Sequence, residues 1–218
     1  MPEATLVEAV NLALARAMAD DQRVILLGED IGKDGGVFRA TDGLLARFGS
    51  ERVLDTPLAE VAIAGVAIGL AAQGFRPVAE IQFMGFAYAT IDQLLNHAAR
   101  LRNRTRGRLT CPMVMRTPCG AGIHAPEHHS ESGEACFTNI PGLRVVIPSS
   151  PQRGYGLLLA AIRDPDPRLS SLNRPGSTAR FGSGLPMTGM GCRSISASSC
   201  ARTVTSRWSA GARSFAKC

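Results

Sequence analysis

The fold is decided by residues 55–83, DTPLAEVAIAGVAIGLAAQGFRPVAEIQF. Thr56 is a good helix N-cap and Pro57 suits a first helical position, so the sequence predicts a helix over Leu58–Gln73. A strand is expected over Val78–Phe83. The helical part is apolar or small at almost every position, which is typical of a helix buried on all sides. Its one ionisable side chain is Glu60, in the first turn.

Glu60 has two interpretations. A carboxylate in the first turn stabilises the positive end of the helix dipole, and this is a common structural role. A carboxylate in a dry setting either finds a strong partner or stays protonated, which is typical of a functional acid. The residues of the helix alone leave both interpretations open.

Strands and helices alternate along the first 167 residues. A capping box at Thr5–Glu8 opens the first helix, and the apolar run Val24–Leu27 predicts a buried strand. This alternation predicts an α/β fold with a doubly wound, mostly parallel sheet. Gly28-Glu29-Asp30 follows the first strand, and acids just past such a strand lie where open parallel sheets bind ligands.

A histidine-rich loop spans residues 120–132 and contains His124, His128 and His129. Such a cluster can bind a metal ion, but no cysteine or acid set of the usual zinc type accompanies it. An acid–base group or a substrate contact is therefore the favoured interpretation. The six cysteines also lack metal-ligand spacing, and we expect free thiols in a reducing compartment.

The net charge of +6 is unevenly distributed. Residues 168–218 contain seven Arg, one Lys and no acid, so they carry +8 and leave −2 for residues 1–167. No nucleic-acid-binding motif accompanies the basic segment, so we expect no nucleic-acid partner. No secretory signal and no apolar run long enough to span a membrane is visible, so a cytoplasmic protein is expected.

Several motifs occur in a characteristic order: GED, DTPLAE, EIQF, FAYATIDQ, HHSE, GLRVVIPSSP and LLLAAIRDPDP. Together they resemble the beta subunit of the thiamine-diphosphate-dependent decarboxylating component of 2-oxo acid dehydrogenase complexes. The resemblance runs from about Thr5 to Pro167 and covers the transketolase-like pyrimidine-binding domain. It implies a subunit that helps oxidise pyruvate, or alternatively a branched-chain 2-oxo acid, and transfers the acyl group to lipoyl.

The resemblance also implies roles for individual residues. Glu60 matches the glutamate that hydrogen-bonds the aminopyrimidine ring and promotes formation of the thiazolium ylide. Phe86 matches the aromatic residue that packs on the pyrimidine, His129 matches the loop histidine at the substrate, and Glu29 is a further cofactor-site residue. A potassium site is implied at Met113, Ala161, Ile162, Asp164 and Asp166, mostly through backbone oxygens.

The implied site is incomplete in this chain. The Gly-Asp-Gly…Asn motif that holds the diphosphate and its Mg²⁺ is absent, and the resemblance places it on an alpha subunit. The implied assembly is therefore an α2β2 heterotetramer that docks on a lipoyl acyltransferase core. We expect the chain alone to be inactive.

After Pro167 the resemblance ends abruptly. With permitted codons, a reading frame shifted by one base can turn Pro167–Arg180 into PVVFFEPTRLYRA and Thr203–Cys218 into GDVTLVSWGALVREV, both of which resemble the family. We therefore infer a frameshift after Pro167. It predicts two segments: an incomplete pyrimidine-binding domain at 1–167 and a disordered basic tail at 168–218. The domain would lack the strand that follows Pro167 in the family, and a neighbouring strand of its sheet would be left unpaired. A non-catalytic truncated remnant is the alternative to an enzyme subunit.

Overall fold

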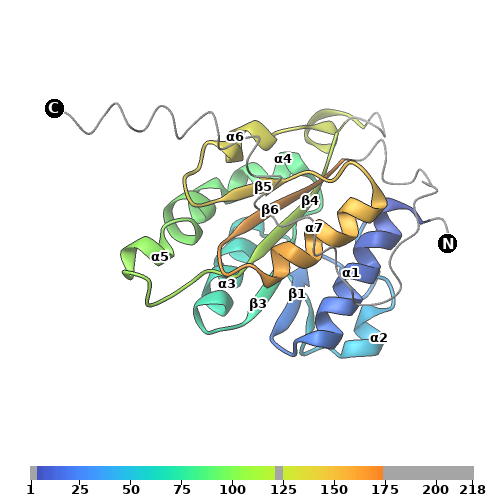
Figure 1. Ribbon diagram of the computed structural model, residues 1–218. Helices are drawn as coiled ribbons and strands as arrows, with labels where there is room; N and C mark the ends of the chain where they lie inside the picture. The colour runs from blue at the N-terminus through green and yellow to red at the C-terminus, as the bar shows by residue number, and fades with distance from the viewer. Residues whose placement is uncertain (1–3, 121–124, 174–218) are drawn as a thin grey trace. The chain divides into compact units, whose positions relative to one another are not determined.

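The architecture is that of a computed structural model, which describes residues 4–120 and 125–173 (Figure 1). Six strands form one sheet in the order β2-β1-β3-β4-β6-β5, and every neighbouring pair is parallel. The strands are β1 (Val24–Gly28), β2 (Val53–Asp55), β3 (Arg76–Glu80), β4 (Val114–Cys119), β5 (Arg144–Val146) and β6 (Arg168–Asn173). The predicted doubly wound parallel α/β fold is confirmed.

Helical segments connect the strands. They are α1 (Leu6–Asp20), α2 (Leu44–Phe48), α3 (Glu60–Ala72), α4 (Met84–Ala87), η1 (Tyr88–Thr90), η2 (Gln93–Ala98), α5 (Leu101–Arg104), η3 (Glu127–Ser130), α6 (Glu134–Thr138) and α7 (Pro151–Arg163). The capping box at Thr5 and Glu8 is present at the start of α1. Ser150 caps α7 in a similar way, because its side chain accepts a hydrogen bond from the Arg153 backbone N–H.

Successive residues of a strand face opposite sides of the sheet, and β1, β2, β3 and β4 contribute to a core on each side. Leu26 and Val78 face the core formed with α1, α2 and α7, whereas Leu27 and Ala79 face the core formed with α3, α4 and η2. α1 and α7 lie side by side on the first face (Figure 1). Burial on both faces explains why β1 is a continuous apolar run.

The start of α3 differs from the prediction. The helix begins at Glu60, Ala59 occupies the cap position, and no side chain caps it. Thr56 does not cap the helix: its Oγ1 is buried and has no hydrogen-bond partner among the described residues, and its backbone N–H donates to Gly28 O (3.0 Å), which continues the β1–β2 pairing beyond the strand. The chain then bends at Leu58, which is 79% exposed, before the helix begins.

The prediction that α3 is buried on all sides is also wrong in the described chain. One face packs on the sheet through Ile63, Ala64 and Ala67. The opposite face is open: Val61 is 47% exposed and Val66 is 53% exposed. An apolar helix with one open apolar face has surface available for another protein surface to cover.

The prediction that the sheet loses its strand after Pro167 is wrong as well. β6 begins at Arg168 and lies between β4 and β5, with Leu169 fully buried. The serines at 170 and 171 do not prevent this, because both neighbouring strands supply backbone hydrogen-bonding partners irrespective of side chain. The fold therefore extends at least six residues into the basic segment. The rest of the predicted tail, 174–218, lies outside the described residues.

Candidate functional site

The predicted site residues gather at the carboxyl edge of the sheet. Glu29 follows β1, Glu60 opens the helix after β2, and Phe86 lies in α4 just after β3. The carboxyl ends of parallel strands meet at one edge, and this edge is where open α/β sheets bind ligands. The alternation of strands and helices is thus what brings together acids and rings that are far apart in sequence.

Glu29 and Glu60 form the acidic part of this site. Glu29 is only 7% exposed, and within the described residues its Oε1 finds no hydrogen-bond partner. Burial raises the pKa of Glu29, and the nearby charges of Glu60 and Asp30 raise it further. Glu60 is half-buried at the first position of α3. A buried oxygen without a partner beside a second carboxyl group fits a site built to receive hydrogen-bonding groups.

Aromatic rings surround His129. Its ring centroid lies 4.6 Å from that of Phe83 and 5.2 Å from that of Phe86, both edge-on. Phe83 also contacts Phe38 at 5.7 Å, which joins the loop after β1 to this group. The structure thus brings Phe86 and His129, two of the predicted site residues, into contact.

Two glycines allow the histidine loop to approach the helices. A Cβ on Gly85 would lie 2.4 Å from His128 O, and one on Gly133 would lie 2.3 Å from the Tyr88 hydroxyl. Tyr88 hydrogen-bonds Glu131, which together with burial raises the pKa of Tyr88 to about 12. His124 lies outside the described residues, and no cluster able to hold a metal ion occurs in the described part of the chain.

The residues of the sequence did not point to a buried ion pair beneath the site. Glu80 on β3 and Arg116 on β4 are register partners, and their side chains are almost fully buried and paired with each other. Burial lowers the pKa of Arg116 to about 10. A Cβ on Gly36 would lie 2.9 Å from Glu80 Oε1, so the Gly35-Gly36 turn sits directly on this pair. The available signal was Glu80, a charged residue inside the strand that the sequence predicts over Val78–Phe83.

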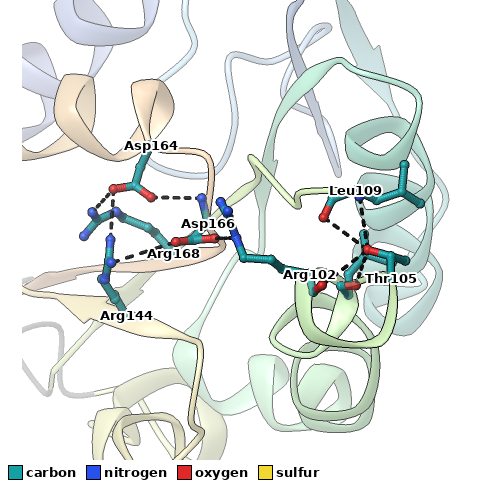
Figure 2. A network of polar contacts seen from close by, with 8 residues as sticks. Arg102, Thr105, Leu109, Arg144, Asp164, Asp166 and Arg168 are labelled. Atoms are coloured by element: carbon teal, nitrogen blue, oxygen red, sulfur yellow. Dashed lines mark hydrogen bonds and ion pairs between the residues drawn. The ribbon is translucent and has the colours of Figure 1, made fainter. Parts of the chain in front are cut away.

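The predicted potassium residues lie at the opposite end of the strands. Met113 precedes β4, Ala161 and Ile162 end α7, and Asp164 and Asp166 lie in the loop before β6. The two carboxylates join a network with Arg102, Arg144 and Arg168 (Figure 2). Burial opposes ionisation of Asp164, but hydrogen bonds from Arg168 and the Asp166 backbone lower its pKa overall.

Fold and site together define an α/β domain in which acids and aromatic rings gather at the carboxyl edge of a parallel sheet. The family described as "Transketolase, pyrimidine binding domain" matches residues 3–175, and the chain belongs to this family. The match continues past Pro167, in agreement with the observed β6. The transketolase family implies thiamine diphosphate as the cofactor.

Curated proteins similar in sequence match the same region of the chain. The chain is 56% identical over 163 residues to the pyruvate dehydrogenase E1 component subunit beta of Acholeplasma laidlawii, covering 75% of this chain and 50% of that protein. It is 52% identical to the 2-oxoisovalerate dehydrogenase subunit beta of Bacillus subtilis, with the same coverage. The chain therefore spans about half the length of the curated relatives it matches.

Solved structures agree on the fold. A split-gene transketolase, described as an inactive beta4 tetramer, superposes with a TM-score of 0.63 at 21% identity over 79% of this chain and 52% of that chain. Transketolase from Leishmania mexicana gives the same TM-score at 18% identity, over 79% of this chain and 26% of that chain. No helix in the described ranges is long and apolar enough to cross a membrane.

Proposed function

We propose that this chain is the beta subunit of a cytoplasmic, thiamine-diphosphate-dependent 2-oxo acid dehydrogenase, with pyruvate as the preferred substrate and a branched-chain 2-oxo acid as the alternative. The observation that carries the proposal is the pair of carboxyl groups, Glu29 and Glu60, at the carboxyl edge of the sheet. The identity of more than half to a pyruvate dehydrogenase beta subunit supports the substrate class.

The residues present fit the pyrimidine half of the cofactor. When bound, thiamine diphosphate would supply the nucleophilic and electron-accepting chemistry that decarboxylation of a 2-oxo acid needs. Glu60 would hydrogen-bond the ring nitrogen of the pyrimidine. Glu29, whose pKa burial raises, limits the negative charge beside Glu60. Phe86 packs against the ring, and His129 hydrogen-bonds the substrate from within its aromatic surroundings.

The other half of the site belongs, in this proposal, to an alpha subunit that holds the diphosphate and Mg²⁺. The open apolar face of α3 supports such a partner, because Val61 and Val66 lie on the same helix as Glu60 and are half exposed. The assembly is then an α2β2 heterotetramer that passes its acyl group to the lipoyl groups of an acyltransferase core. The proposed K⁺ site is considered in the next subsection.

A non-catalytic remnant is the second candidate. The observation that favours it is the acid-free, basic composition of residues 168–218, where the resemblance predicts the start of a second domain. The two candidates differ when the chain as written is mixed with an alpha subunit. If the chain as written is an enzyme subunit, the mixture decarboxylates the 2-oxo acid. If it is a remnant, the mixture is inactive, and only a chain whose C-terminal part is translated in the shifted reading frame restores activity. Sequencing the coding DNA around the Pro167 codon decides independently whether the frameshift is present.

Substitution of Glu60 tests the assigned role. In a chain translated in the shifted reading frame after Pro167, combined with its alpha partner, we expect Glu60→Gln to lower decarboxylation at least ~100-fold, or about 2.7 kcal/mol in transition-state free energy. The fold should survive, because Glu60 is half-buried at a helix terminus. Glu51→Gln, at an exposed position outside the site, is the control and should keep full activity. Near-normal turnover of the Glu60 variant would refute the role.

A further inference from the structure

The carbonyl groups assigned to potassium are already engaged within the chain. Met113 O accepts a hydrogen bond from Arg168 N (3.0 Å), and Ala161 O accepts one from Asp164 N (3.2 Å). Ile162 O accepts one from Arg76 Nη1 (2.8 Å), so a guanidinium faces this carbonyl. A bound K⁺ would have to share these oxygens with donors, one of which is positively charged.

The two carboxylates of the same loop are paired with arginines (Figure 2). Asp164 Oδ2 lies 2.9 Å from Arg144 Nη1 and also contacts Arg168 Nη2. Asp166 Oδ1 lies 2.7 Å from Arg102 Nε, and its Oδ2 lies 3.9 Å from Arg144 Nη2. The remaining Asp164 oxygen, Oδ1, accepts from the Asp166 backbone N–H at 2.9 Å. These contacts join the α7–β6 loop to β5, β6 and α5.

The charge of this network is unfavourable for another cation. Two carboxylates face three guanidinium groups, so the network is net positive before any ion enters. The side chain of Arg168 is only 4% exposed and that of Asp164 15%, so solvent screens them poorly. Arg144 and Arg168 are also register partners on β5 and β6, and Asp164, which contacts both, offsets their repulsion.

Arg168 belongs to the chain as written and not to the shifted reading. The shifted string begins PVVF, with no charged side chain in the first positions of the strand, whereas this chain places Arg168 at the start of β6. The positive charge that faces Asp164 is thus a side chain of β6, the Arg168 guanidinium, and not a bound ion.

We propose that the guanidinium groups of Arg168 and Arg144 take the place of the K⁺ that the resemblance implies, so that the α7–β6 loop closes without a monovalent metal ion. The inference rests on assigning residues 161–166 as the loop that the proposed family uses for potassium. Its test measures stability, so it can fail while the role of Glu60 in catalysis stands, and the reverse also holds.

Thermal unfolding of the full chain in KCl, NaCl and choline chloride at equal ionic strength is the test. We expect the three Tm values to coincide. A K⁺-specific rise of a few degrees, the size expected for an ion bound well above its Kd, would overturn the proposal.

Two variants sharpen the result. We expect Arg168→Met to lower Tm in choline chloride and to regain part of the loss specifically in KCl, because it removes the buried cation and keeps an unbranched side chain. Arg23→Met, at an exposed arginine paired with Asp21 outside the network, is the matched control and should show no K⁺ response. A folded Arg168→Met chain without a K⁺-specific gain would refute displacement by Arg168. If that variant does not fold, the salt comparison on the unaltered chain decides.

Discussion

At the scale of single residues, the site contains a carboxyl group that opposes folding. Glu29 is buried, lacks a hydrogen-bond partner for Oε1 within the described residues, and lies near the charge of Glu60. A buried unpaired charge of this kind costs stability, and such a cost is typical of residues kept for function. The Glu80–Arg116 pair differs, because each buried charge there has its partner on the neighbouring strand.

Glu29 therefore makes stability depend on pH. Because its pKa is higher in the folded chain than the ordinary value of 4.5, ionisation weakens the fold as pH rises above 4.5 and through the folded-state pKa. We expect Glu29→Gln to stabilise the chain by about 1 kcal/mol at neutral pH, with the gain vanishing below pH 4.5. Denaturant unfolding across this pH range measures it. A gain that persists undiminished at acid pH would contradict the charge explanation.

At the scale of elements, β6 decides how far the domain extends. It lies between β4 and β5, so its removal leaves β5 without any neighbour and exposes one edge of β4. Strand edges exposed in this way pair readily with other chains and favour aggregation. β6 therefore stabilises the sheet through its backbone, even though its sequence is not that of a typical buried strand.

Two truncated chains test the contribution of β6. We expect residues 1–173 to unfold at the same temperature as the full chain, because this chain keeps β6 complete. Residues 1–167 should melt several degrees lower or aggregate, since they lose Leu169 from the core, a burial worth roughly 2 kcal/mol. Circular dichroism and limited proteolysis measure both. Equal stability of the two truncated chains would show that β6 is not part of the cooperative unit.

At the scale of the whole molecule, the chain spans about half the length of the curated relatives it matches. In our proposal it also carries half of a site, because its carboxyl groups and aromatic rings would hold a pyrimidine while its sequence contains no diphosphate motif. The open face of α3 begins at the same helix turn as Glu60, so a partner that covers α3 would also reach the site. Assembly and cofactor binding should therefore be coupled.

Cofactor binding by the isolated chain tests this coupling. We expect thiamine diphosphate with Mg²⁺ to bind the chain alone with a Kd no tighter than about 1 mM, because the diphosphate supplies much of the binding free energy. When an alpha subunit is added to a chain translated in the shifted reading frame after Pro167, thiamine diphosphate with Mg²⁺ should bind tightly. Isothermal titration calorimetry gives both values. A tight, Mg²⁺-dependent isotherm without a partner would show that this chain holds the diphosphate itself.

The sequence by itself determined the alternation of strands and helices, the capping box of α1 and the identity of the acids and rings in the site. Hydrophobic runs and caps are local signals, and the motif order identified the family. The sequence did not show that α3 starts at Glu60, because Thr56 contacts Gly28 at the end of β1, which is distant in sequence, and does not cap the helix.

Only the tertiary structure decided the contacts between distant segments. In the sequence Arg168 is only a basic residue in a polar stretch. In the folded chain β4 and β5 supply its backbone partners, and Asp164 supplies the anion that pairs with its side chain. In the same way, Glu29 and Glu60 become one site only because β1 and β2 are parallel neighbours. Register and burial depend on the whole sheet, and they decide which charges face each other and which are screened by water.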